Sequence, residues 1–306
     1  MNQVARIVVT GLTGQVVQSL VEQGNSRGDF EVVPLGRPQL DLEDPSGIEG
    51  VVRAAAPDVI VSAAAYTAVD HAETDPTRAY AVNAVAPQEL ARVANALDIP
   101  IIHLSTDYVF DGTKSTPYVE GDTACPVNVY GKSKWEGERT VAAATDNHVI
   151  LRTAWIYSPF GRNFVRTIIR NARNRTELSV VKDQAGNPTS ALDLATAIIG
   201  VAKNLLASDE QALRGTFHLA GTGDASWADV AEEILALSRG LGGPFARVNR
   251  ILSADYPTAA ARPSNSRLDC NKIARHHGIT LPHWKNSIEA TVRRVIQNQA
   301  DLEVTK

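Results

Sequence analysis

Cysteine is scarce in this sequence, and its scarcity excludes several classes of protein. Among 306 residues the cysteines are Cys125 and Cys270, too few for a disulfide framework. They form no CxxC pair, so the sequence predicts neither a zinc ribbon nor a redox motif of that kind. We interpret both as ordinary thiols in a reducing compartment.

The sequence also lacks an excess of basic charge and any long apolar run. Lys plus Arg total 30 against 34 Asp plus Glu, a net charge of −4, which leaves no basic stripe for nucleic acid. No apolar run approaches the length of about 18 residues that a membrane span needs. The N-terminus has no features of a secretory signal. We expect a cytoplasmic globular protein with a small soluble partner, and neither nucleic acid nor membrane as a partner.

What the sequence does contain is a regular alternation in its first half. In residues 4–152, short apolar runs alternate with longer segments of helical period, and five strand–helix units fit there. The runs are ARIVVTG, FEVVPLG, DVIVSAAA, IPIIHLSTD and NHVILRT. This pattern predicts an α/β fold, a Rossmann-like doubly wound parallel sheet with helices on both faces.

The pattern changes in the second half, where short strands and loops rich in Pro and Gly are mixed with helices. Helical segments are predicted near 163–174, 191–207, 226–239 and 285–299. Because 306 residues exceed what one hydrophobic core usually supports, we expect two domains. We expect residues 1–152 to form a dinucleotide-binding domain, for which the motifs below give the evidence, and 153–306 to form most of a smaller α/β substrate-binding domain. Strands near 177–183 and 216–220 are expected to return to the first sheet.

A glycine-containing turn, TGLTGQVV, follows the first apolar run and opens the first helix. Gly11 permits a tight turn, and Gly14 lets the backbone approach a pyrophosphate at the positive end of the helix. The third position of a dinucleotide fingerprint is Val17 where glycine is usual. The turn therefore predicts a dinucleotide site, although a ligand-free strand–helix turn is the alternative interpretation.

The end of the second apolar run bears on the choice of cofactor. The chain there reads PLGRPQLDLED. Arg37 lies where an arginine can accept a 2′-phosphate, while Asp41 and Leu42 are expected to flank the adenine. We therefore expect NADPH, with NADH as an alternative, because Arg37 is also consistent with a solvated surface arginine.

A tyrosine and a lysine lie one helical turn apart in VNVYGKSKWEGERT. A helix starting near Val129 places Tyr130 and Lys134 on one face, about 6 Å apart along its axis. A free phenol has a pKa of about 10, and a nearby ammonium favours its ionised form. We expect Lys134 to bring the pKa of Tyr130 toward the working pH, where it serves as a general acid. An exposed Tyr and Lys on a helix surface is the alternative interpretation.

The fourth apolar run ends in LSTDYVFDG, which places Ser105, Thr106 and Asp107 at the ligand crevice. With a reduced nicotinamide in that crevice, Tyr130 would protonate a substrate carbonyl oxygen. Thr106 would donate a second hydrogen bond to the same oxygen, and Lys134 would hold the nicotinamide ribose. The pattern therefore predicts reduction of a carbonyl.

Taken together, these motifs resemble a known family. TGxxGxx, AAAYTAVDHAE, STDYVFDG and YGKSK form the signature of the extended short-chain dehydrogenase/reductases. RTAWIYSPFGRNFV, DQAGNPTS and RPSNSRLD, in the second half, resemble the dTDP-4-dehydrorhamnose reductase family. The resemblance runs from about residue 4 to about residue 298 and implies reduction of the C4 ketone of dTDP-4-dehydro-L-rhamnose to dTDP-L-rhamnose.

The resemblance also implies individual site residues. Its catalytic residues are Thr106, Tyr130 and Lys134. Its cofactor contacts are Gly14, Gln15, Val16, Asp41, Leu42, Ala64, Ala65 and Tyr66. Asp107 is implied beside the substrate, and Trp155 in contact with it, although a core aromatic is the other interpretation of Trp155. Arg262 is a candidate for the substrate diphosphate by its charge.

One departure from the family concerns oligomeric state. Some members dimerise through magnesium held by acidic side chains, one of them on the first helix, and this chain has Ser19 about there. We therefore expect a monomer or a weak homodimer without the magnesium bridge. The histidines show no HExxH or other ligand spacing, so no metal site is expected.

Two other functions remain open at this point. One is a reductase of another 4-keto nucleotide sugar, because the sequence separates the stereochemical outcomes poorly. The other is a non-catalytic NADP-binding subunit that resembles the regulatory subunit of methionine adenosyltransferase. The presence of Thr106, Tyr130 and Lys134 disfavours the second, since a binding subunit has no chemical need for these three residues.

Overall fold

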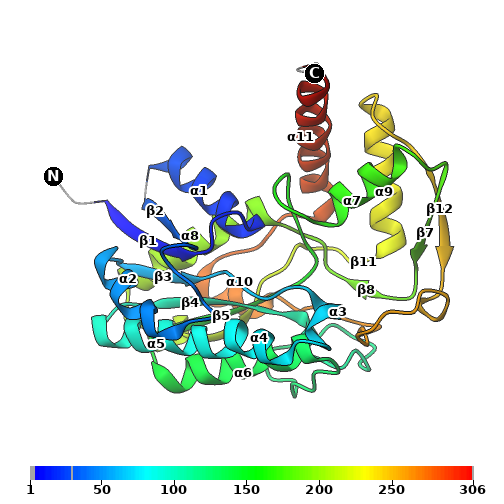
Figure 1. Cartoon of the computed structure of the whole chain (residues 1–306). Helices are drawn as coiled ribbons and strands as arrows, with labels where there is room; N and C mark the ends of the chain where they lie inside the picture. The colour runs from blue at the N-terminus through cyan, green and yellow to red at the C-terminus, as the bar shows by residue number, and fades with distance from the viewer. Residues whose placement is uncertain (1–3, 29, 305–306) are drawn as a thin grey trace.

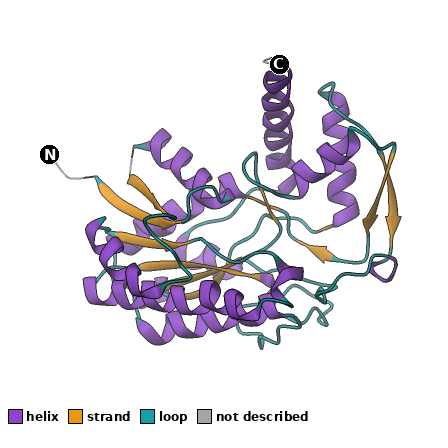
Figure 2. Ribbon diagram, in the orientation of Figure 1, coloured by secondary structure: helices purple, strands orange, loops and turns teal. Residues whose placement is uncertain are grey.

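The structure is a computed structural model that describes residues 4–28 and 30–304. Figures 1 and 2 show two lobes, a larger one built on a parallel sheet and a smaller one in which helices lie beside a strand pair. The sheet has 6 strands in the order β10-β5-β4-β3-β1-β2, and all of their pairings are parallel. They are β1 (Ala5–Thr10), β2 (Phe30–Leu35), β3 (Val59–Ser62), β4 (Ile101–Thr106), β5 (His148–Thr153) and β10 (Gly215–His218).

The strands are short apolar runs because helices cover both faces of the sheet. Every residue of β3 and β4 is buried. One face packs against α1 (Gln15–Arg27), α8 (Ala191–Ala207) and α10 (Asn271–His277). The other packs against α2 (Ile48–Ala54), α5 (Ala86–Leu97) and α6 (Val129–Ala144). The predicted fold class, a doubly wound parallel α/β sheet, is confirmed. Helix α10 was not predicted.

The strand order reverses beside β1, which lies between β2 and β3. Loops that leave neighbouring strands on opposite sides of such a point open a crevice at the carboxyl ends of the strands. Gly11 follows β1, Ala63 follows β3 and Asp107 follows β4, so all three start loops at that edge. The topology therefore brings together the three motifs found separately in the sequence.

The segment before α5 contains two short helices and a π-helical turn. It consists of α3 (Val69–Ala72), α4 (Pro76–Tyr80) and a π-helical turn (Ala81–Val85) that runs into α5. The turn buries Asn83, whose Oδ1 accepts from the Tyr66 N–H at 2.8 Å and whose Nδ2 donates to Ser133 Oγ at 2.9 Å. Asn83 therefore ties the loop after β3 to α6.

The smaller lobe has its own apolar core. Three helices and one parallel strand pair enclose it, namely α7 (Phe164–Ala172), α9 (Trp227–Gly240), α11 (Trp284–Val304), β7 (Glu177–Val181) and β12 (Arg247–Ile251). Two pairs of very short strands connect the lobes, β6 (Ile156–Tyr157) with β9 (Thr189–Ser190) and β8 (Ala185–Gly186) with β11 (Ala225–Ser226). Single 3₁₀ turns lie at Pro45–Gly47, Asp107–Val109, Gln211–Leu213 and Ser253–Asp255. Within the described ranges, no helix is both long and apolar enough to span a membrane.

Of the two strands expected to return to the main sheet, one does so. β10 pairs with β5 at the edge of the sheet, as predicted. The expectation for 177–183 was wrong, because β7 pairs with β12 in the smaller lobe. Along β7, buried and exposed residues alternate, as in a strand with one face in solvent, whereas a central strand of the main sheet is buried on both faces.

Candidate active site

The turn between β1 and α1 is shaped to bring backbone close to a ligand. Gly11 has φ of 103°, a conformation that favours glycine, and its N–H donates to the Leu35 carbonyl at 2.6 Å. Gly14 is the N-cap of α1 and makes no side-chain capping bond, so the first N–H groups of α1 remain available to an anion. Val17 is buried, and its Cγ2 would lie 3.2 Å from a Cβ added to Gly11. Val17 therefore fills the space beside the turn without obstructing it.

Two adjoining cavities run along this edge of the sheet, with volumes of about 470 Å³ and 430 Å³. They share Gly11, Leu12, Thr13, Ala64 and Ala65. Each residue predicted to contact the cofactor lines one or both. Gly14, Gln15, Val16, Tyr130 and Lys134 line the first, and Arg37, Asp41, Leu42 and Tyr66 line the second.

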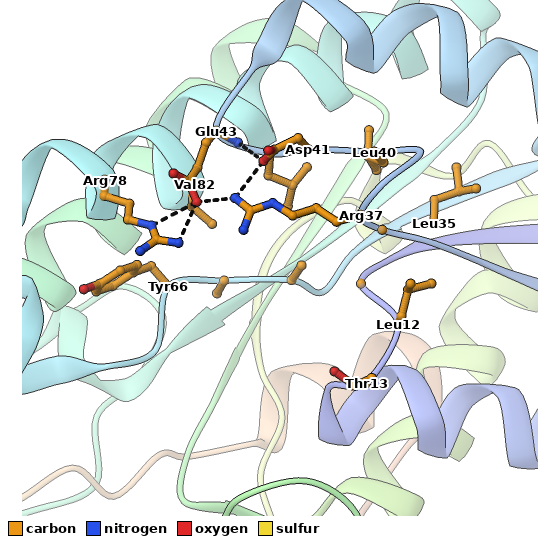
Figure 3. Close-up of a pocket in the computed structure, with 15 residues that line it drawn as sticks. Leu12, Thr13, Leu35, Arg37, Leu40, Asp41, Glu43, Tyr66, Arg78 and Val82 are labelled. Atoms are coloured by element: carbon orange, nitrogen blue, oxygen red, sulfur yellow. Dashed lines mark hydrogen bonds and ion pairs between the residues drawn. The ribbon is translucent and has the colours of Figure 1, made fainter.

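Arg37 lies in the second cavity within a group of four charged side chains (Figure 3). Its Nη2 donates to Asp41 Oδ1 at 2.8 Å and also to Glu43 Oε1. Arg78, on α4, donates to the same Glu43 oxygen from Nε at 2.9 Å. Hydrogen bonds to Asp41 and Glu43 raise the pKa of the guanidinium of Arg37 above its already high value. Arg37 is therefore a cation in the second cavity that two carboxylates of the chain already hold. The two adjoining cavities are together called the cofactor groove below.

Tyr130 and Lys134 both line the first cavity, as the helical spacing predicts. Their electrostatic coupling differs from the expectation. Burial raises the pKa of Tyr130 to about 12, against a smaller opposing effect of the Thr106 hydroxyl. Lys134 Nζ donates instead to the Leu104 carbonyl at 2.6 Å. The prediction that Lys134 brings the phenol near the working pH was therefore wrong, because helical spacing says nothing about the desolvation of the phenol.

Lys134 is buried, and its surroundings disfavour the protonated form of its side chain. Burial lowers its pKa to about 8, although the carboxylate of Glu138 opposes the shift. Its Nζ is 3.4 Å from Nε2 of the buried His103, whose Nδ1 is 3.1 Å from Ser62 Oγ. Desolvation and the nearby Lys134 charge lower the pKa of His103 well below its usual value, so the ring is neutral at pH 7.

A buried ion pair joins α6, the helix that carries Lys134, to the main sheet. Arg152 Nη2 donates to Glu138 Oε2 at 2.7 Å and Nε donates to Oε1 at 2.9 Å, with both side chains at most 4% exposed. Ser105 Oγ donates to the same carboxylate at 2.5 Å. This bidentate arrangement fixes α6 against the ends of β4 and β5, and so fixes the helix that carries Tyr130.

Thr106 and Asp107 lie beside Tyr130 and are buried. The Thr106 hydroxyl donates to Asp107 Oδ1 at 2.9 Å and accepts from the Tyr108 N–H at 3.2 Å. Burial raises the pKa of Asp107 to about 6, against the smaller opposing effects of the nearby Ser266 and Thr106 hydroxyls. Its Oδ2 has no hydrogen-bond partner within the described part of the chain. That free acceptor is suited to a hydroxyl group of a ligand.

Trp155 and Arg262 lie on the side facing the smaller lobe. Trp155 has φ of 46°, and its ring stacks on Trp227 with 3.8 Å between centroids. Arg262 donates to Asp70 through both Nη atoms, at 3.0 Å and 2.8 Å. Both ends of that pair, together with Trp227, line a third cavity of about 710 Å³ between the lobes.

Some residues at the site were not singled out from the sequence. Glu43, Arg78, Asp70, His103 and Trp227 each contact a residue that was. No spacing motif predicts these residues, since Arg78 reaches Tyr66 and Trp227 reaches Trp155 only through the tertiary fold. Within the described residues, no group of three or more His, Cys, Asp or Glu side chains is arranged to hold a metal ion.

Comparisons with known proteins identify the family of this chain. The family model described as RmlD substrate binding domain matches residues 5–297. A dTDP-4-dehydrorhamnose reductase of Sinorhizobium fredii is 50% identical over 287 residues, which cover 94% of this chain and 96% of that protein. One from Aggregatibacter actinomycetemcomitans is 40% identical, with 93% and 97% covered.

Solved structures give the same result. The structure of dTDP-4-dehydrorhamnose reductase from Bacillus anthracis in complex with NADP superposes with a TM-score of 0.87 at 32% identity, covering 94% of this chain and 99% of that one. The Clostridium acetobutylicum protein of that name gives a TM-score of 0.86 at 34% identity, covering 94% and 98%. This chain therefore belongs to the dTDP-4-dehydrorhamnose reductase family.

Proposed function

We propose that this protein reduces the C4 ketone of dTDP-4-dehydro-L-rhamnose to dTDP-L-rhamnose with NADPH, and with NADH as a second cofactor. The observation that carries the proposal is the shared cavity of Tyr130, Lys134 and the N-terminus of α1. A proton donor, a cation and an anion-binding helix end therefore line the space that one bound dinucleotide would occupy. The names of the two relatives described above supply the identity of the sugar.

The residues of the two cavities fit a dinucleotide. The uncapped N-terminus of α1 has free N–H groups for a pyrophosphate, and Arg162 lines the same cavity. Thr153 Oγ1, also in that cavity, is buried without a hydrogen-bond partner in the described residues. Lys134 would hold the nicotinamide ribose, and Arg37 the 2′-phosphate. When bound, the reduced nicotinamide supplies the hydride for the ketone.

Tyr130 serves as the proton donor in this proposal. With a pKa of about 12 the phenol keeps its proton at neutral pH, so it enters the reaction as an acid. The ketone oxygen becomes an alkoxide as the carbon is reduced, and an alkoxide is a stronger base than a phenolate. The proton then moves from Tyr130 Oη to that oxygen, while Thr106 donates a second hydrogen bond.

The substrate side supports a sugar nucleotide. Asp107 Oδ2 accepts from a sugar hydroxyl, and Trp155 forms the wall of the sugar site. The 710 Å³ cavity between the lobes has room for the nucleotide. Arg262 would face the diphosphate there with its charge partly balanced by Asp70, which also hydrogen-bonds the Ala260 N–H at 3.0 Å.

The test uses the enzymatically prepared ketosugar. We expect loss of NADPH absorbance that depends on the sugar, and an L-rhamnose configuration of the product by NMR. The C4 epimer as product would support the alternative of a different 4-keto nucleotide sugar reductase. Retained NADPH binding without any consumption by the ketosugar would support a regulatory subunit.

We also propose that the protein works in the cytoplasm as a monomer or weak homodimer. Ser19, which stands where some relatives have a metal-binding acid, is buried and donates to the Gln15 carbonyl at 2.8 Å. Glu22, the acid one turn further along α1, is bound by Arg294 of α11 through two hydrogen bonds of 2.8 Å and 2.9 Å. Light scattering with and without magnesium tests this, and a magnesium-dependent dimer would contradict it.

A further inference from the structure

The charged group at the outer end of the cofactor groove contains a carboxylate shared between two guanidinium groups. Glu43 Oε1 accepts from Arg37 Nη2 and from both Nε and Nη2 of Arg78, the last two at 2.9 Å and 2.8 Å. Figure 3 shows the Glu43 side chain between the two arginines, with the carboxylate facing both. Charge-assisted bonds of this kind are the ones that arginines make to phosphate oxygens.

Arg78 is oriented toward this carboxylate by a second contact. Its guanidinium carbon lies 5.7 Å from the centre of the Tyr66 ring, in the range of a cation–π interaction. All of Arg37, Asp41, Glu43, Tyr66 and Arg78 line the 430 Å³ cavity. The cavity therefore presents two cations to a ligand, and the chain already supplies an anion to each.

The formal charge of this group is balanced. Two guanidinium groups face two carboxylates, because Asp41 Oδ1 also accepts from Arg37 Nη2 at 2.8 Å. A 2′-phosphate that bonds to the same N–H groups of Arg37 and Arg78 must therefore compete with the carboxylate of Glu43. A ribose that carries only hydroxyl groups does not compete with the Glu43 carboxylate, because it needs acceptors such as Asp41 and not cations.

We propose that Glu43 is a specificity-determining residue that competes with the 2′-phosphate for Arg37 and Arg78, and so lets the enzyme accept cofactors with and without that phosphate. This inference rests on the proposed function in one respect, the placement of a dinucleotide in the groove. Arg78 becomes the second phosphate-binding cation, beside Arg37. Removal of the Glu43 charge converts the site into one selective for the phosphorylated cofactor.

The test is calorimetric titration of the whole protein with 2′,5′-ADP and with 5′-AMP, which differ by the 2′-phosphate. We expect Glu43→Gln to bind 2′,5′-ADP about tenfold more tightly than the parent at low salt, since a dianion then meets two cations and one carboxylate. Binding of 5′-AMP should change less than twofold. The side chains of Arg37, Glu43 and Arg78 are 34–55% exposed. The gain in affinity for 2′,5′-ADP should therefore shrink as salt is raised above about 0.15 M.

Two further variants make the result specific. Glu49→Gln is the matched control, because Glu49 is an exposed acid paired with Arg53 at 2.7 Å but lies outside the cavity, and it should leave both affinities unchanged. Addition of Arg78→Ala to Glu43→Gln should abolish the gain for 2′,5′-ADP.

Several outcomes would overturn the inference. They are weaker or unchanged 2′,5′-ADP binding by Glu43→Gln, equal gains for both nucleotides, and no binding of 2′,5′-ADP to either protein. Failure to reduce the ketosugar, with the expected nucleotide affinities, would refute the proposed function and leave the role of Glu43 standing.

Discussion

Replacement of Lys134 by methionine should make the protein more stable at neutral pH, by an amount that declines as pH rises. Lys134 is 3% exposed, and burial lowers its pKa from 10.5 to about 8. A lowering of that size corresponds to about 3 kcal/mol of unfavourable free energy for the charged form in the folded chain. Methionine has a similar length and carries no charge, so the variant lacks this cost.

The pH dependence has a definite sign. Between pH 8 and 10.5 the unfolded chain binds a proton at Lys134 that the folded chain has lost, so the stability of the parent increases with pH through this window. Below pH 8 both states are protonated and the penalty is fully present. The hydrogen bond from Nζ to the Leu104 carbonyl, at 2.6 Å, is lost in the variant at every pH and offsets part of its gain.

The assay is urea unfolding of the two proteins at pH 7, 8.5 and 10, followed by tryptophan fluorescence. The free energy of unfolding of Lys134→Met, minus that of the parent, should fall by about 2 to 3 kcal/mol from pH 7 to pH 10. Titrating groups remote from Lys134 cancel in this difference, and the neighbouring His103 is neutral throughout this pH range because its pKa lies well below the usual value. A difference that stays constant with pH would refute the claim that Lys134 is a strongly desolvated cation.

Two other substitutions test the support of the site. Glu138→Gln should lower the free energy of unfolding by about 3 to 5 kcal/mol because it leaves Arg152 buried without its carboxylate. Glu136→Gln, in an exposed pair on the same helix, should cost less than about 1 kcal/mol, and equal losses in urea unfolding would contradict the assignment. In Gly186→Ala the new Cβ would lie 2.4 Å from Cε2 of Trp155. Steady-state kinetics should then show a KM for the ketosugar at least fivefold higher with NADPH affinity retained, and an unchanged KM would argue against Trp155 as part of the sugar site.

Much of the larger lobe can be predicted from the sequence because its strands are buried on both faces and read as unbroken apolar runs. β4 is such a run, and its polar end places Thr106 and Asp107 at the crevice. The smaller lobe was harder to predict. In RVNRI, the sequence of β12, no residue is fully buried, so the strand has no apolar signature. Its partner β7 was recognised as a strand and then assigned to the wrong sheet.

In the candidate site, too, some contacts can be predicted from the sequence and others cannot. Positions close in sequence, such as Tyr130 and Lys134, share a cavity because helical geometry dictates it. Contacts between distant segments, such as Glu43 with Arg78, depend on the packing of α4 and carry no spacing signal. The prediction for the pKa of Tyr130 was wrong for a related reason, since burial is a property of the folded environment and raises the pKa of the phenol.

The role of Tyr130 as proton donor is tested most directly by Tyr130→Phe, assayed for turnover of the ketosugar and, separately, for NADPH affinity. The account predicts a fall in kcat/KM of about 10² to 10⁴, with the NADPH dissociation constant within twofold of the parent. Tyr108→Phe is the matched control, since its ring packs edge-on against that of Tyr130 at 5.7 Å, and it should retain most turnover. Retained turnover in Tyr130→Phe, or a loss explained entirely by weaker NADPH binding, would contradict the account.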